Sequence, residues 1–280
     1  MSLPSQMIAP VFSLGAVLTW GTSDFVGGYA ARRANAFYLT ALAHFSGLTL
    51  VVITAIFTHT PFPGRDSLLW SLAAGSVGGV SLAIFYRALA SGKMGLTAPV
   101  AALLGAGIPT VVTALREGMP APARFLGFVL AAVGIWLISR PEGEAGHPEG
   151  LGMAALAGIG FAGFYLCVRQ AGDASALWVA ATSRTASFLV TLLFALLGRN
   201  RRDLTAPIVG LAIFAGCLDI SGSTFFIRAS QAGRLDVAVV LSSLYPAITV
   251  VLARVLLGER FSSWRTVGLL AALAAVPLVA

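Results

Sequence analysis

Four ionisable side chains stand inside long apolar stretches of the 280-residue chain: Asp24, His44, Arg184 and Asp219. In a segment that crosses a membrane, such a charge is costly and marks a candidate functional site. A guanidinium such as Arg184, or the imidazole of His44, suits a carboxylate group of a ligand, and Asp219 or Asp24 suits a counter-ion or an amine. The structural alternative stays open, because the same residues can pair only to hold helices together.

Counting residues from shared loops, at 1.5 Å of helix per residue, places these four side chains in two pairs. Arg184 and Asp219 fall at matching depth in consecutive apolar segments, and so do Asp24 and His44. The spacing therefore predicts an Arg184–Asp219 pair and an Asp24–His44 pair. His44, with an imidazole that titrates near neutrality, is also a candidate proton carrier.

The composition decides what kind of protein must position these groups. Hydrophobic residues make up 58% of the chain and charged residues only 10%, far below the quarter that is usual in soluble domains. A water-facing shell built from this chain would be mostly apolar. The composition excludes an ordinary soluble enzyme, a nucleic-acid-binding domain and a disordered chain, and it indicates a polytopic integral membrane protein.

Apolar stretches of about 20 residues, the length that crosses a bilayer, recur along the whole chain. They do not alternate apolar and polar residues as barrel strands do, so we expect an all-α integral membrane protein. The expected transmembrane helices are ten: 10–30, 36–58, 67–90, 94–115, 122–140, 150–169, 176–198, 206–231, 235–257 and 263–280. Ser242 and Ser243, ahead of Tyr245 and Pro246, predict a break in the ninth, and Pro99 and Pro109 predict one in the fourth.

The two halves of the sequence match when the chain is shifted by 141 residues. Phe85, Arg87, Ala88 and Gly92 fall on Phe226, Arg228, Ala229 and Gly233, and Ala74-Gly75 falls on Ala215-Gly216. Residues 1–140 therefore form a first five-helix repeat, 141–149 a linker and 150–280 a second five-helix repeat. Because five is odd, the repeats have inverted topology, an architecture common among secondary transporters.

Three stretches carry a resemblance to a known family: Trp20-Gly21-Thr22-Ser23, Phe85-Tyr86-Arg87-Ala88-Leu89, and residues 241–260 with their Pro246 and Gly258-Glu259-Arg260 corner. The chain resembles the drug/metabolite transporter superfamily, in its EamA-type ten-helix branch, and within it the YddG-like amino-acid exporters. The first half departs from the pattern, since its corner reads Arg116-Glu117-Gly118.

The resemblance implies export of amino acids or related metabolites, and helices that line a central cavity. Trp20, Tyr86, Tyr165 and Tyr245 lie on those helices. With Asp24, His44, Arg184, Asp219, Ser242 and Ser243 they complete the expected substrate-binding residues. The resemblance also implies cytoplasmic termini, whereas the basic residues gather in loops after odd-numbered spans and favour the opposite orientation.

Function follows as an expectation: a secondary transporter of the bacterial inner membrane, working by alternating access between the repeats. The alternatives are an intramembrane enzyme acting on a lipid or small metabolite, and a structural membrane subunit. The sequence has no HExxH, GxSxG or Walker motif, so we expect no enzyme activity, cofactor, metal or ATP site. The expected partners are a small-molecule substrate and membrane lipids, not nucleic acid, and the expected state is a monomer.

Overall fold

The structure is a computed structural model that describes residues 5–91, 94–138, 150–198, 204–258 and 262–279. These residues form α-helices joined by short loops, with no strand among them. The predicted linker 141–149 and the Glu259-Arg260 corner lie outside the described residues. The helices are α1 Ser5–Ala31, α2 Ala36–Phe57, α3 Arg65–Ser91, α4 Met94–Glu117, α5 Pro122–Ile138, α6 Leu151–Gln170, α7 Ala176–Leu197, α8 Ala206–Ala232, α9 Leu235–Ser242, α10 Tyr245–Leu257 and α11 Ser263–Val279.

Each expected span coincides closely with a helix, but the spans are not uniform in length or hydropathy. Within the described residues, seven spans are long and apolar enough to cross a membrane: α2, α3, residues 97–117 of α4, α6, α7, α8, and α9 with α10 taken together. Helices α5 and α11 are shorter, with 17 residues each. Helix α1 is diluted by polar residues between Thr19 and Asp24. The structure is thus a multi-pass, all-helical membrane protein.

The ninth expected span is broken where the sequence predicts it. Helix α9 ends at Ser242, and α10 starts at Tyr245 with Pro246 in its first turn, where a missing N–H costs nothing. The fourth span corrects the corresponding expectation, because α4 runs through Pro99 and Pro109 as one helix. Neighbouring helices can compensate a proline inside a membrane helix, so the residue type alone does not fix a break.

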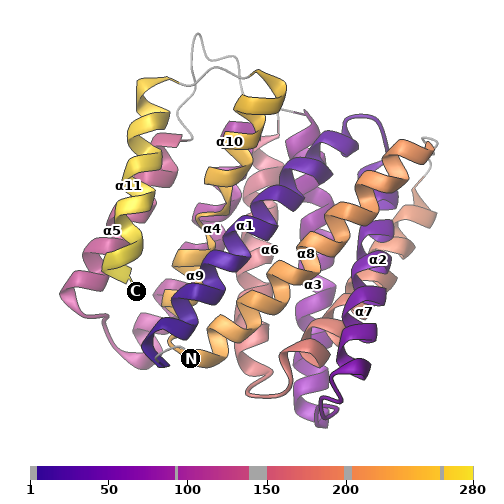
Figure 1. Ribbon diagram of the computed structural model, residues 1–280, viewed down its shortest axis with the longest axis horizontal. Helices are drawn as coiled ribbons and strands as arrows, with labels where there is room; N and C mark the ends of the chain where they lie inside the picture. Colours follow the sequence, from indigo (N-terminus) through magenta and orange to yellow (C-terminus); the bar gives the residue numbers. More distant parts are fainter. Residues whose placement is uncertain (1–4, 92–93, 139–149, 199–203, 259–261, 280) are drawn as a thin grey trace.

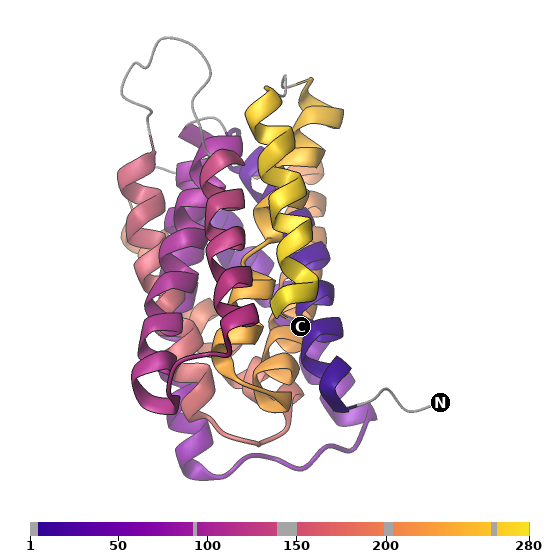
Figure 2. The same cartoon turned by 90° about the vertical axis from the view of Figure 1, so that its left-hand side faces the viewer.

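The helices of the first half interleave with those of the second (Figures 1 and 2). Helix α1 packs against α8, α3 against α6, and α2 against α7. At one edge α5 packs against α11, as Figure 1 shows on its left side. The start of α1 and the end of α11 point to the same end of the bundle.

Glycine allows two of these helix pairs to approach closely. A Cβ on Gly75 of α3 would overlap the backbone of Ser183 on α7, and one on Gly216 of α8 would overlap the backbone of Ala43 on α2. At the first contact Ser187 donates its hydroxyl to the carbonyl of Gly75 at 2.8 Å. Small residues of this kind let backbones pack closely where no hydrophobic force joins the helices.

Most hydroxyl groups on the helices bond to their own helix. Thr40, Ser81 and Thr191 each donate to the carbonyl four residues earlier, at 2.7 Å. Such a bond satisfies a polar group in an apolar surrounding without tying it to a neighbouring helix. Direct polar links between helices also occur, among them Ser23 to the carbonyl of Ala215 and Thr249 to that of Gly21.

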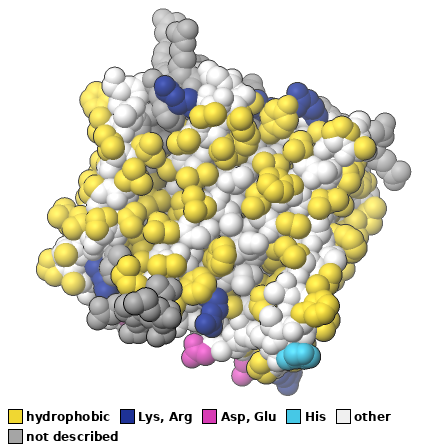
Figure 3. All heavy atoms as spheres, in the orientation of Figure 1, with side chains coloured by type: hydrophobic (Ala, Val, Ile, Leu, Met, Phe, Trp, Pro, Cys, Tyr) yellow, Lys and Arg dark blue, Asp and Glu magenta, His cyan; other side chains and the backbone are white. Residues whose placement is uncertain are grey.

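The outer surface is apolar over its middle. Figure 3 shows hydrophobic side chains across the central zone of one face, with basic side chains near its upper and lower margins and acidic ones at the lower margin. Large exposed side chains such as Leu18, Phe57, Leu197 and Leu256 belong to this surface. An apolar band with charged margins is the surface that a bilayer covers.

Candidate functional site

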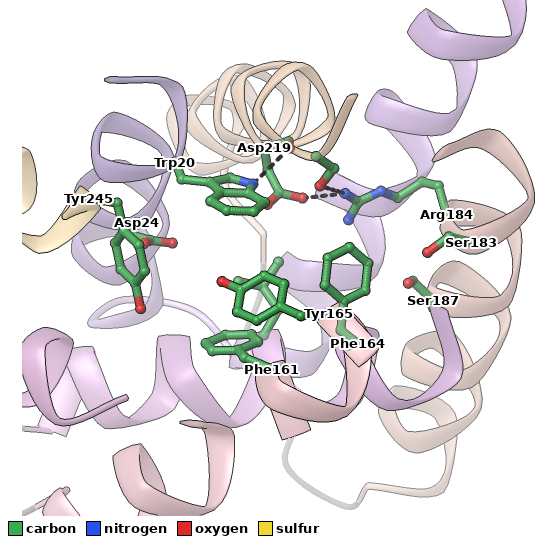
Figure 4. Close-up of a pocket in the computed structure, with 13 residues that line it drawn as sticks. Trp20, Asp24, Phe161, Phe164, Tyr165, Ser183, Arg184, Ser187, Asp219 and Tyr245 are labelled. Carbon is green, nitrogen blue, oxygen red and sulfur yellow. Dashed lines mark hydrogen bonds and ion pairs between the residues drawn. The ribbon is translucent and has the colours of Figure 1, made fainter. Parts of the chain in front are cut away.

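A cavity lies in the interior of the bundle, between helices of both halves. It encloses about 60 Å³, more than one water molecule requires. Helices α1, α3, α6, α7, α8 and α10 supply its walls. The lining residues are Trp20, Asp24, Gly78, Leu82, Phe161, Phe164, Tyr165, Ser183, Arg184, Ser187, Asp219, Ser223 and Tyr245 (Figure 4).

An ion pair occupies one end of the cavity. Nη2 of Arg184 on α7 lies 2.6 Å from Oδ2 of Asp219 on α8, and the same nitrogen donates to Oγ of Ser223 at 3.1 Å. Both charged residues are only 7% exposed. The pair predicted from helix depth is therefore confirmed, and its two charges compensate each other inside the bundle.

Trp20 lies between the ion pair and two tyrosine rings of the cavity wall. Its indole Nε1 donates to the backbone carbonyl of Asp219 at 3.2 Å. Its ring centroid lies 6.1 Å from that of Tyr165 and 6.4 Å from that of Tyr245. Gly222 of α8 makes room for the indole, since a Cβ there would lie 2.8 Å from Nε1.

Asp24 enters the cavity one helical turn after Trp20. Its carboxyl is 5% exposed and, within the described part of the chain, forms neither a hydrogen bond nor an ion pair. Figure 4 shows it beside Tyr245 and Trp20, with the carboxyl directed to the space that Tyr165 borders from the opposite side. The cavity thus joins a compensated ion pair at one end to an uncompensated carboxyl among aromatic rings.

The expected pairing of Asp24 with His44 is wrong. Both ring nitrogens of His44 are buried without a hydrogen-bond partner in the described structure. Helix α2 packs mainly against α7 and α8, so equal depth does not bring its His44 to Asp24 on α1. Depth along a helix fixes only one coordinate; the rotation of the helix decides which neighbour a side chain meets.

Six of the ten predicted residues line the cavity: Trp20, Asp24, Tyr165, Arg184, Asp219 and Tyr245. The other four, His44, Tyr86, Ser242 and Ser243, are buried behind it. The Tyr86 hydroxyl lies 3.1 Å from Oγ of Ser23, and the Ser23 hydroxyl donates its hydrogen to the carbonyl of Ala215. Tyr86 therefore acts as the donor to Ser23, in a bond that ties α3 to α1.

Sequence reasoning missed seven lining residues: Gly78, Leu82, Phe161, Phe164, Ser183, Ser187 and Ser223. For three of them, the 141-residue shift indicates a place in the cavity wall, because it relates them to lining residues of the other half. It relates Phe161 to Trp20, Gly78 to Asp219, and Leu82 to Ser223. Each lies where the other half has a lining residue, although its side chain has different chemistry.

A polar clasp, formed by Glu117, Gly118, Arg169, Arg234 and Asp236, closes one end of the bundle. Arg234 donates to both carboxylate oxygens of Asp236 and, at 3.0 Å, to the carbonyl of Gly118. Arg169 pairs with Glu117 at 3.4 Å. The hydrogen bond to Asp236 raises the pKa of Arg234, which lies in the loop before α9. The clasp joins the α4–α5 loop of the first half to α6 and the α8–α9 loop of the second.

Membrane-length apolar helices around a cavity that contains charged side chains define a polytopic membrane protein with an internal site. Residues 148–280 match the EamA-like transporter family, so the chain carries an EamA-like transporter domain in its second half. The predicted EamA-type relationship is confirmed for these residues.

A solved crystal structure shares the fold of the whole chain. It superposes with a TM-score of 0.76 at 18% sequence identity, over 96% of this chain and 95% of that one. At this identity the likeness shows the fold alone. Comparison with curated protein sequences gives no significant match.

Proposed function

We propose that the protein is a secondary transporter that exports amino acids or related small metabolites across the bacterial inner membrane. It works as a monomer by alternating access around the central cavity, which lies between a first repeat, residues 1–140, and a second, residues 150–280. The observation that carries the proposal is the cavity itself, in which charged side chains lie among apolar and aromatic walls from both halves. Midplane sites between repeats are the usual arrangement in secondary transporters.

The helix contacts support ten spans in two inverted repeats, with α9 and α10 counted as one span. Under the 141-residue shift, α1 corresponds to α6, α2 to α7, α3 to α8, α4 to α9 with α10, and α5 to α11. The α1–α8 contact then corresponds to α6–α3, and the α2–α8 contact to α7–α3, all of them major contacts. The pairs α2–α7 and α5–α11 correspond to themselves.

Individual residues follow the same relation. Gly75 meets Ser183 and accepts from Ser187, while Gly216 meets Ala43 and Ser46. The shift relates Gly75 to Gly216 and Ser187 to Ser46. The two crossings are built alike, which supports the repeat relation on which the proposed alternating access rests.

The proposed substrate-binding residues are those that the cavity presents. Arg184, Asp219 and Asp24 supply charge, and Trp20, Tyr165 and Tyr245 supply aromatic faces. His44, Tyr86, Ser242 and Ser243 lie behind this wall. They are proposed to reach the substrate in another conformation of the cycle.

Exchange in proteoliposomes tests the proposal. Vesicles loaded with a mixture of unlabelled amino acids and related metabolites take up labelled compounds from outside by counterflow if the protein transports them. We expect uptake of at least one compound above that of protein-free vesicles, without ATP. Flux equal to protein-free vesicles across the whole panel, with protein that is folded and inserted, contradicts the proposal.

A further inference from the structure

With all three side chains ionised, the charges of Arg184, Asp219 and Asp24 in the cavity sum to minus one. Arg184 and Asp219 compensate each other at 2.6 Å, and Ser223 holds the same guanidinium nitrogen. Asp24 remains, with no hydrogen bond or ion pair in the described part of the chain. An ionised carboxylate at this depth needs a positively charged partner, and the bundle does not supply one to Asp24.

The surroundings of Asp24 favour a particular kind of partner. Trp20, Tyr165 and Tyr245 border the same cavity, with the Trp20 ring about equally distant from the two tyrosine rings. Aromatic faces attract cations through the negative charge above and below the ring, most strongly where water is excluded. A carboxyl with several such faces around it is suited to an ammonium group, whose charge it meets and whose methyl or methylene groups the rings contact.

The packing of the two repeats does not by itself require a carboxyl group at Asp24. The 141-residue shift relates Asp24 to Tyr165, which lines the cavity from the other half without a charge. The same wall position is therefore filled by an uncharged side chain in one half and by an acid in the other. The acid adds chemistry that the packing of this position does not require.

We propose that Asp24 and the rings of Trp20, Tyr165 and Tyr245 form a subsite for the ammonium group of a small organic cation. The proposal rests on the proposed transport function and names the substrate class of that cavity. A monocation balances the cavity charge. A zwitterion brings a carboxylate together with its ammonium group and leaves one negative charge of the cavity uncompensated.

Three compounds of nearly equal shape separate these possibilities. Choline is a monocation, 3,3-dimethylbutan-1-ol replaces its nitrogen by carbon and is neutral, and glycine betaine adds a carboxylate to the trimethylammonium group. Binding to the purified full-length protein in detergent is followed by calorimetry, and flux by counterflow in proteoliposomes. We expect choline to bind at least about tenfold more tightly than either of the others.

Two matched variants locate the effect. Asp24→Asn keeps the shape of the side chain and removes its charge, and we expect at least about a tenfold loss of choline affinity. Asp173→Asn makes the same chemical change at an exposed residue of the α6–α7 loop, outside the cavity, and should leave choline binding unchanged. If Asp24→Asn does not fold, the comparison of choline with its neutral isostere on the unmodified protein decides.

The outcomes separate this inference from the function on which it rests. Equal affinity for choline and dimethylbutanol, tighter binding of glycine betaine, or choline binding unaffected by Asp24→Asn overturns the subsite, whether or not amino acids are transported. Choline binding that depends on Asp24, in a protein that moves no compound of any panel, supports the subsite and overturns transport.

Discussion

Arg184 and Asp219 face each other across two consecutive helices, with 2.6 Å between Nη2 and Oδ2, in the interior of the bundle. The hydroxyl of Ser223 completes the group from the turn after Asp219. The loop between α7 and α8 is far from this contact along the chain, so the pair fixes the relative depth of two long helices at their middles.

Removal of one partner should be more harmful than removal of both. Arg184→Ala leaves the Asp219 carboxylate buried and alone, and we expect a loss of about 3–5 kcal/mol of stability. The double variant Arg184→Met with Asp219→Leu replaces the pair by apolar side chains and should recover most of that loss. Thermal unfolding in detergent measures both.

Substrate exchange should be lost in the single and the double variant alike if the pair serves transport. A double variant that is stable and still exchanges substrate at the unmodified rate would assign the pair to helix packing alone. Comparison of the two variants separates stability from function, which the single substitution confounds.

Two glycines should tolerate no side chain. Gly75→Ala and Gly216→Ala place a methyl group against a neighbouring backbone, which cannot rotate away. We expect each to cost about 1–3 kcal/mol, the usual range for an overpacked interior. Gly210, in the same helix as Gly216, has open space at its Cβ position. Gly210→Ala should be neutral or stabilise by up to about 1 kcal/mol.

Thermal stability and the monodispersity of the purified variants check this prediction. If Gly216→Ala is as stable as Gly210→Ala, the α2–α8 crossing is looser than the structure has it.

Replacement of His44, in contrast to that of the two glycines, should increase stability. Its imidazole is 1% exposed, and neither nitrogen has a hydrogen-bond partner in the described structure. Burial of unsatisfied polar groups is unfavourable, so His44→Leu should raise stability by about 1–3 kcal/mol. Denaturation in detergent without substrate gives the measurement. Destabilisation of similar size would mean that the imidazole is satisfied by a group such as an ordered water.

The polar clasp allows a comparison of two arginines. Asp236 is completely buried, whereas Glu117 and Arg169 each keep more than a third of the side chain exposed. Arg234→Gln therefore leaves a buried carboxylate unpaired and should cost about 3–5 kcal/mol. Arg169→Gln breaks an exposed pair worth about 1 kcal/mol at most, besides its bond to the Ser230 carbonyl.

Unfolding of the two variants at low and high salt tests the difference. High salt should weaken the Arg169–Glu117 contribution more than that of Arg234, because the Asp236 carboxylate is completely buried and is poorly screened. Equal losses for both variants would contradict the assignment of the clasp's strength to the Arg234–Asp236 pair.

Sequence predicted the helices well because each depends on a local property, the length of apolar chain between polar loops. It predicted Arg184–Asp219 because consecutive helices share a loop from which depth can be counted. It failed for Asp24–His44, where the rotation of α2 toward α7 and α8 is set by packing between distant parts of the chain. It also missed Phe161 and Phe164, apolar residues whose position at the cavity depends on which helices surround it.

The hydroxyl groups that bond back to their own helices, such as those of Thr40, Ser81 and Thr191, have a mechanical consequence. Each carries its acceptor with it when its helix moves, so sliding past a neighbour breaks none of these bonds. Movement of one helix along another is then opposed by the packing of side chains and by the hydrogen bonds and ion pairs that join different helices. In such a bundle, a small shift of one helix along another costs little hydrogen-bond enthalpy.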